Sequence, residues 1–131
     1  MKRFFAVVFV LTVILAICGC SKTSVDKNAE VTLTFVCGQD NICVVLTDDE
    51  AAKVTNILDG NRYDSVFSGI PSCGFDQDVS LKVGNRVFAI AGDTCNYIQD
   101  LGNLRFFAIS QEDMAYIHAL FEKYGGYFPW I

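Results

Sequence analysis

The sequence predicts a single α+β domain, with two helices packed on one face of a mostly antiparallel sheet of about five to six strands. Two observations carry this prediction. Short strand-like stretches are separated by turn residues over most of the chain, and two amphipathic stretches each follow a hydroxyl residue and an acidic turn. The predicted order of elements is β-β-α-β-β-β-β-α.

The first two strands form a predicted hairpin. Residues 31–35 (VTLTF) alternate between apolar and polar side chains, which is typical of a strand with one buried face. Residues 38–41 (GQDN) have turn chemistry. Residues 42–46 then return as a second, more buried strand.

Two capped helices are predicted. Thr47 and Glu50 have the spacing of a capping box, and the two aspartates between them favour the positive end of the helix dipole. Gly60 ends this helix. A second helix follows Ser110 in the same manner and ends at Gly125. The predicted apolar faces are Ala51, Val54, Ile57 and Leu58 in the first helix, and Met114, Ile117, Leu120, Phe121 and Tyr124 in the second.

The four remaining predicted strands form two pairs, and the two strands of each pair are separated by a Gly-Asn turn. Residues 61–74 are loop-like because they contain glycines and a proline. Gly84-Asn85 predicts a two-residue hairpin turn, and Gly102-Asn103 a second turn. The predicted strands of this half are residues 79–83, 87–91, 97–99 and 104–109.

The N-terminal segment has the composition of an export signal. Lys2 and Arg3 precede an apolar run at residues 4–17, which is short for a spanning helix of about 20 residues. The run ends in Ile17-Cys18-Gly19-Cys20, which resembles the lipobox of bacterial lipoproteins. The resemblance implies cleavage after Gly19 and acylation, for example with palmitate, of the Cys20 thiol.

This resemblance divides the chain into three parts. Residues 1–19 are expected to be a signal peptide that is removed. Residues 20–30 are polar and have no apolar period, so we expect a lipidated, flexible tether. Residues 31–131 are expected to form one disulfide-stapled domain, which resembles small bacterial lipoprotein domains of unassigned role.

The charge balance limits the classes of partner that the domain is expected to bind. Removal of Lys2 and Arg3 leaves 8 basic and 15 acidic residues, a net charge of −7. An acidic domain repels the phosphate backbone, so we expect no nucleic-acid partner. An anionic membrane surface would not attract it either, so the lipid alone is expected to hold the chain at the membrane.

Four cysteines remain once Cys20 carries lipid, and an even number outside the cytoplasm favours disulfides. Cys37 and Cys43 flank the five-residue stretch 38–42, so we expect them to lie opposite one another and pair. In the second hairpin the turn makes paired residue numbers sum to 169. Cys95 would then face residue 74, and one bulge would bring it to Cys73. We therefore predict Cys37–Cys43 and Cys73–Cys95.

The sequence contains few candidate catalytic or metal-binding residues. The pairing sum places residue 76 opposite residue 93, so Asp76, Asp78 and Asp93 could converge. Such a cluster could bind a hard cation or act in acid–base chemistry, whereas the simpler interpretation is solvated loop acids. The single histidine, His118, has no serine or cysteine motif beside it and is expected at the surface or its boundary. No motif calls for a cofactor.

The chain end is rich in aromatic residues. Tyr127, Phe128 and Trp130 fall within the last five residues. They are expected either to pack against the sheet or, if exposed, to form a partner-binding patch, because Trp and Tyr dominate interface hot spots.

The leading hypothesis is a lipid-anchored cell-envelope protein at the extracytoplasmic side of the cell membrane or outer membrane. It would be a non-catalytic binding, inhibitor-type or accessory module with an envelope or secreted protein as partner. One alternative is an envelope hydrolase or metal-binding protein that uses Asp76, Asp78 and Asp93. A further alternative is a structural surface lipoprotein.

Overall fold

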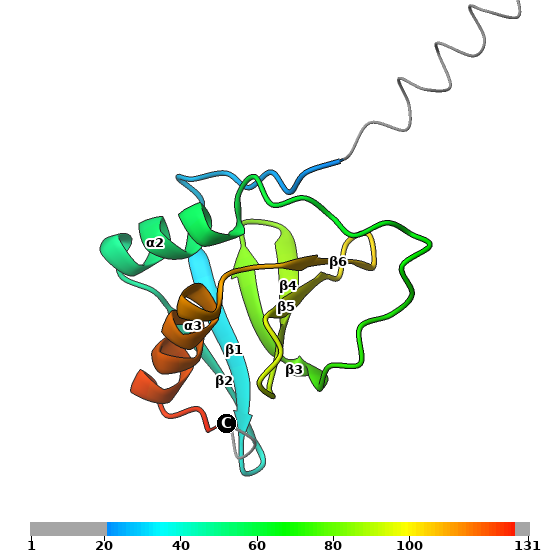
Figure 1. Cartoon of the computed structure of the whole chain (residues 1–131). Helices are drawn as coiled ribbons and strands as arrows, with labels where there is room; N and C mark the ends of the chain where they lie inside the picture. The colour runs from blue at the N-terminus through cyan, green and yellow to red at the C-terminus, as the bar shows by residue number, and fades with distance from the viewer. Residues whose placement is uncertain (1–20, 128–131) are drawn as a thin grey trace, which may run out of the picture.

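The computed structural model describes residues 21–127 and confirms the α+β architecture (Figure 1). Six strands form one antiparallel sheet in the order β2-β1-β3-β4-β5-β6, accompanied by two helices. The strands are β1 (Val31–Cys37), β2 (Asp40–Val45), β3 (Phe75–Val83), β4 (Arg86–Ala91), β5 (Tyr97–Asp100) and β6 (Arg105–Ala108). The helices are α2 (Asp48–Leu58) and α3 (Gln111–Lys123).

The strands lie side by side in chain order, except that β1 lies between β2 and β3. β1 and β2 form the first hairpin, and the chain then passes through α2 before β3 pairs with the free side of β1. Strands β3 to β6 follow as successive antiparallel neighbours. Leu33, Leu81 and Phe88 lie in one row across the sheet, because Leu33 faces Leu81 and Leu81 faces Phe88. β2 and β6 are the two edges.

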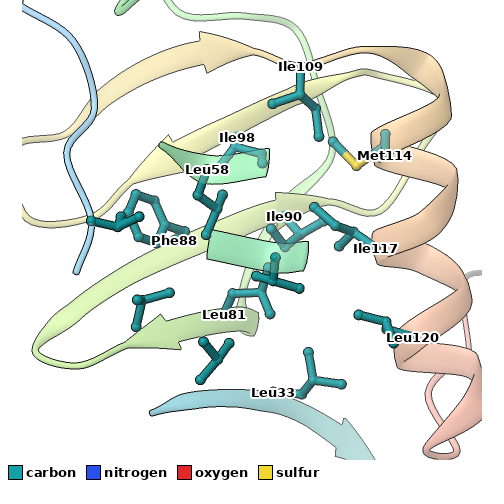
Figure 2. Packing of buried hydrophobic residues seen from close by; sticks show 14 of the residues in the cluster. Leu33, Leu58, Leu81, Phe88, Ile90, Ile98, Ile109, Met114, Ile117 and Leu120 are labelled. Carbon is teal, nitrogen blue, oxygen red and sulfur yellow. The ribbon is translucent and has the colours of Figure 1, made fainter. Parts of the chain in front are cut away.

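The core lies between one face of the sheet and the two helices. Alternate strand residues point to this face, so a row such as Leu33, Leu81 and Phe88 is fully buried. Figure 2 shows these side chains meeting Leu58 from α2 and Ile117 from α3. Each fully buried aliphatic or aromatic side chain of this kind contributes about 1.5–3 kcal/mol. The predicted apolar helix faces are therefore used as expected.

Both predicted helix caps are present. The Thr47 side chain accepts a hydrogen bond from the Glu50 amide, and the Glu50 carboxylate accepts one from the Thr47 amide. Ser110 caps α3 by accepting from the Asp113 amide at 3.0 Å. These bonds satisfy amide groups that the first helical turn leaves without partners.

Glu50 also joins the two helices. Its carboxylate accepts hydrogen bonds from Lys123 Nζ at 2.6 Å and from the Tyr124 hydroxyl at 2.8 Å. The bond from Lys123, followed by those from Tyr124 and Thr47, outweighs the opposing effect of burial and lowers the pKa of Glu50 from 4.5 to about 2. One carboxylate thus holds the start of α2 against the end of α3.

The predicted flexible tether is wrong for residues 21–30, which dock against the domain. Thr23 is buried, its amide donates to Asn61 O at 2.7 Å, and its carbonyl accepts from the Gly60 amide at 2.9 Å. Its hydroxyl donates to Leu58 O, a carbonyl at the end of α2. Val25 is buried in the core cluster. The segment is ordered because it supplies partners to the polar groups that a helix end leaves open.

The Glu50 junction predicts a specific pH dependence. Because the folded-state pKa is lowered, the carboxylate's contribution to stability is complete above about pH 4.5 and is lost as pH falls towards about 2. Glu50→Gln should lower the free energy of unfolding at pH 7 by about 1 kcal/mol or more. The difference from the unaltered protein should shrink below pH 4.5.

Urea unfolding between pH 2 and pH 8 measures this difference. The control is Glu112→Gln, since Glu112 is an exposed acid in the first turn of α3, and it should stay within about 0.5 kcal/mol at every pH. A Glu50→Gln difference that does not change with pH contradicts the prediction.

Candidate functional site

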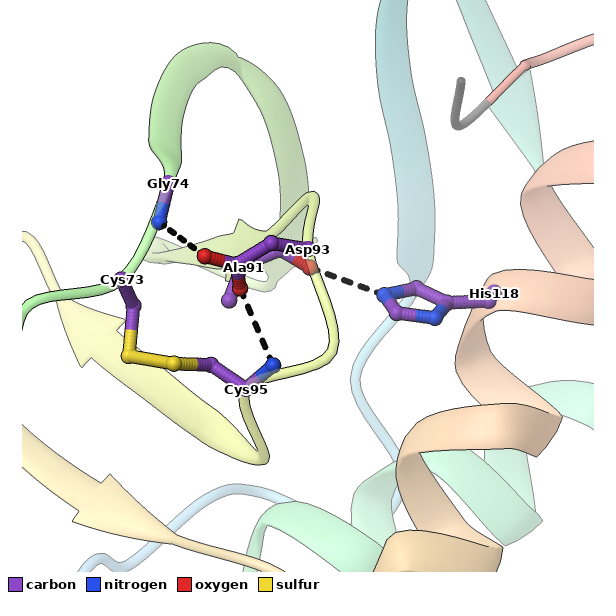
Figure 3. The surroundings of a disulfide bond; sticks show 6 residues. All are labelled: Cys73, Gly74, Ala91, Asp93, Cys95 and His118. Carbon is purple, nitrogen blue, oxygen red and sulfur yellow. Dashed lines mark hydrogen bonds between the residues drawn. A yellow bond between two sulfur atoms is a disulfide. The ribbon is translucent and has the colours of Figure 1, made fainter. Parts of the chain in front are cut away.

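The Cys73–Cys95 disulfide is present, as predicted (Figure 3). The two Cα atoms are 5.8 Å apart, and the bond joins the loop before β3 to the connection between β4 and β5. Asp93 supports it from both sides, because its carboxylate accepts hydrogen bonds from the Gly74 amide at 2.8 Å and the Cys95 amide at 3.0 Å. In the chain-entropy account a loop of this length contributes between about 3 and 4 kcal/mol.

The predicted convergence of Asp76, Asp78 and Asp93 is wrong. The pairing sum of 169 holds from Val83 opposite Arg86 to Ser80 opposite Ala89, and then the register shifts so that Phe75 faces Ala91. Asp76 and Asp78 lie within this irregularity, where both are exposed and Asp76 accepts from the Asp78 amide at 2.9 Å. The bulge that brings the two cysteines together therefore separates these acids from Asp93.

One grouping of metal-ligand type exists among the described residues, and it is not a metal site. Potential ligand atoms of Cys73, Asp93 and Cys95 lie within 4.8 Å of one another. The two sulfur atoms are bonded to each other, however, and a metal is bound by thiolates. The carboxylate is already used to fix the neighbouring backbone.

The predicted Cys37–Cys43 disulfide is wrong, since both thiols are free and exposed. The hairpin turn consists of two residues instead of the expected five, because Gly38 has a φ of 66° and permits a tight turn. Cys37 lies at the end of its strand, whereas Cys43 faces Thr34. A displacement of three positions puts the two side chains on opposite faces of the ribbon.

His118 is buried, which corrects the expectation of a surface or boundary position. Its Nε2 lies 2.8 Å from the carbonyl oxygen of Ala91, so this nitrogen donates (Figure 3). The bond fixes α3 on β4. In the predicted helix, His118 directly follows the core residue Ile117. The carbonyl group that accepts its hydrogen bond comes from β4, which the sequence did not place beside it.

A buried charged cluster, which sequence reasoning missed, lies on the core side of one end of the sheet. Asp100 is almost fully buried and accepts hydrogen bonds from Arg86 and from the Tyr63 hydroxyl. Arg86 also donates to the Tyr63 hydroxyl at 2.8 Å and to the carbonyl of Ser24. The other oxygen of Asp100 accepts from the Gly102 amide at 3.0 Å. Asp100 lies at the end of a strand-like stretch, and the local sequence pattern does not indicate that this acid faces the core.

The cluster changes the pKa values of its members. Burial raises the pKa of the Tyr63 phenol, and the hydrogen bond to Asp100 raises it further. Burial is the largest single influence on Arg86 and lowers its pKa, but the hydrogen bonds and charges of Asp100 and Tyr63 together outweigh burial, so the pKa is raised. Arg86 thus stays a cation and Tyr63 stays neutral, so the cluster serves as a fixed internal connection.

A second arginine binds the start of the described chain. Arg105 donates to the Ser21 hydroxyl and, at 2.8 Å, to the Asp64 carbonyl. Its guanidinium lies 4.7 Å from the centre of the Tyr63 ring. The Tyr63 amide in turn donates to Ser21 O at 3.2 Å. Ser21 is therefore held between the loop after α2 and the start of β6.

The loop before β3 and the turn before β6 together carry an exposed apolar patch beside this point, also missed from the sequence. Its members and their exposed fractions are Val66 (74%), Phe67 (94%), Ile70 (83%) and Leu104 (67%). Val66, Ile70 and Leu104 line one hollow of about 240 Å³, together with Asp64 and Arg105. The sequence does carry one signal for this patch, which is three large apolar residues in a stretch that has neither strand nor helix periodicity.

The remaining predicted site residues lie at the chain ends. Tyr127 follows α3 and is 81% exposed, so it is not packed against the sheet. Phe128 and Trp130 lie outside the described residues, as do Cys20 and the predicted signal at 1–19. Within residues 21–127, no helix is long and apolar enough to cross a membrane.

The Asp100 cluster predicts an order of effects on stability. Asp100→Asn should lower the free energy of unfolding by about 3 kcal/mol, because it leaves Arg86 without its charged partner. Tyr63→Phe should cost about 1 kcal/mol, since it removes one hydroxyl from the same network. Asp40→Asn, in the exposed start of β2, should stay within about 0.5 kcal/mol.

Urea unfolding at neutral pH measures all three variants. Equal losses for Asp100→Asn and Asp40→Asn would show that the buried cluster does not stabilise the fold.

Function has to be inferred from the chain's own residues and their geometry. The chain matches no protein-family model, no curated protein and no solved structure.

Proposed function

We propose that this chain is a lipid-anchored cell-envelope protein whose domain binds a protein partner outside the cytoplasm. The observation that carries the proposal is the Ile17-Cys18-Gly19-Cys20 motif at the border of the described domain. Ser21, directly after the proposed acylated cysteine, is already bonded to Arg105 and Tyr63. The proposed lipid would thus be attached to the edge of the folded domain.

The Cys73–Cys95 disulfide supports an extracytoplasmic location. Structural disulfides form and persist in oxidising compartments and are rare in a reducing cytosol. This bond staples a loop of the domain to the connection after β4. A domain that keeps it is suited to the periplasm or the cell surface.

The end of the domain around Tyr127 supports partner binding. α3 ends beside the start of α2, as the bonds from Lys123 and Tyr124 to Glu50 show, and α2 directly follows the edge strand β2. Val36 and Val45 of the first hairpin are exposed apolar residues. An open edge strand can pair with an extended segment of another protein, and exposed aromatic side chains provide anchors.

The geometry favours a binding, inhibitor-type or accessory role over the hydrolase or metal-binding alternative. That alternative needs the carboxylates of Asp76, Asp78 and Asp93 to meet, and the register shift in β3 keeps them apart. A structural surface lipoprotein is the remaining alternative, and it differs in having no specific partner.

Anchoring is tested by metabolic labelling. Cells that express the full chain and are fed radioactive palmitate should incorporate label into the unaltered protein. The Cys20→Ser variant should take up none, because the acylated thiol is missing. Cys37→Ser is the matched control, since Cys37 is an exposed free thiol of the domain, and it should be labelled normally. Label that persists in Cys20→Ser contradicts the proposal.

Partner binding is tested by site-specific photo-crosslinking in intact cells. A photoreactive amino acid at position 127 should give one discrete adduct with an envelope or secreted protein. The control position is Asn85, which is exposed at the β3–β4 turn. The same adduct from both positions would argue against a specific partner face. No adduct from position 127 would favour the structural alternative.

A further inference from the structure

We propose that the apolar patch formed by Val66, Phe67, Ile70 and Leu104 inserts into the interface of the membrane that holds the lipid anchor. The domain would then lie on the bilayer in one fixed orientation. This inference rests on the proposed lipidation of Cys20. It adds a second membrane contact, made by the folded domain itself.

Exposed apolar side chains are concentrated in this patch. Seven large hydrophobic residues are exposed among the described residues, and four of them belong to the patch. Three come from the loop between α2 and β3, and Leu104 comes from the turn between β5 and β6. Val66, Ile70 and Leu104 line one hollow, and exposed apolar residues gathered in this way mark an interaction site with protein or membrane.

The backbone at Leu104 supports an external role for this side chain. Its φ is 56°, in the left-handed region that side chains other than glycine and asparagine rarely adopt. This conformation costs about 1 kcal/mol or more for an L-residue. The leucine is exposed, so little of that cost is recovered inside the domain. A contact outside the domain accounts for an apolar residue here.

The position of the patch identifies the membrane as its occupant. Arg105, adjacent to Leu104, binds the Ser21 hydroxyl and the carbonyl of Asp64, which lies two residues before Val66 in the patch-bearing loop. Consecutive Cα atoms are about 3.8 Å apart, so a lipid on Cys20 would be attached within one residue of this junction. An acylated Cys20 therefore brings the patch to the bilayer surface without any intervening tether.

The loop is held in place, which favours insertion over collapse onto the domain. At its start, the Asp64 amide donates to Phe106 O at 2.8 Å. At its end, Cys73 is bonded to Cys95. In Figure 1 this loop leaves the domain on the side where the described chain begins, projects from the body of the domain and returns to the sheet at the start of β3. The two fixed ends keep the apolar side chains outward.

Two cations accompany the patch on a domain that is acidic overall. Lys22 and Arg62 face each other in an antiparallel bridge, and both are exposed. Their neighbours Thr23 and Tyr63 are buried, so the alternation of an extended chain directs Lys22 and Arg62 outward. Basic side chains near a bilayer that contains anionic lipids are attracted to its negative surface by about 1 kcal/mol each.

Depth-dependent fluorescence quenching tests the inference in the full-length lipidated protein. Trp130→Phe first removes the chain's one tryptophan. Phe67→Trp or Ile70→Trp is then added, and each variant is reconstituted in phosphatidylcholine–phosphatidylglycerol vesicles with plain or brominated acyl chains. We expect both variants to lose most of their emission in the brominated vesicles. Both sites are highly exposed, so the fold should tolerate either change.

Val36→Trp in the same background is the matched control. Val36 is also an exposed apolar residue, but it lies at the far end of β1, and its emission should be the same in both kinds of vesicle. Intact mass of the reconstituted protein shows whether Cys20 is acylated. Acylated protein with unquenched Phe67→Trp and Ile70→Trp overturns the inference alone. Equal quenching at position 36 also overturns it, and protein without acyl mass overturns the anchoring proposal as well.

Discussion

The contact between Asp100 and Arg86 is the constraint on which one end of the domain depends. A carboxylate this deeply buried is tolerated only when its oxygens are bonded, and here Arg86, Tyr63 and the Gly102 amide bond them. The same arginine reaches Ser24, so one ion pair joins β4 and β5 to the loop after α2 and to the first described residues. Polar contacts therefore cover this end of the buried sheet face, whereas apolar side chains of the two helices cover the rest of that face.

The two ends of the molecule therefore differ in construction. At the end with the Asp100 cluster, Arg105 holds Ser21 and the residue Asp64 that precedes the apolar patch, whereas the disulfide holds the end of that loop at the opposite end of β3 and β4. At the other end, Glu50 joins the start of α2 to the end of α3, and Tyr127 follows α3 as an exposed residue. A membrane on the first side and a protein partner on the second would occupy surfaces that do not compete. The net negative charge of the domain favours solubility.

Local signals predicted the elements well because their causes are local. The capping box at Thr47, the tight turn at Gly84 and the helical apolar period each depend on residues close in sequence. The pairing of β3 with β1 depends on contacts across α2, which no local pattern encodes. The same limit explains the errors at Asp76 and residues 21–30. Each depended on a register or a docking partner distant in the chain, as when Thr23 binds the end of α2. The error at Cys43 had a local cause, because the tight turn at Gly38 changed the register of the first hairpin.

The docking of Thr23 bears on the order of events in the proposed processing of the chain. A peptidase needs its substrate in an extended, accessible form, and the proposed cleavage site after Gly19 ends only two residues before Ser21. Once Ser21 and Thr23 are held by Arg105, Asn61 and Leu58, the chain beside that site is no longer free. Under the proposed cleavage, folding and processing would compete for the same few residues, and cleavage would be fastest on a chain whose residues 21–25 have not yet docked on the end of α2.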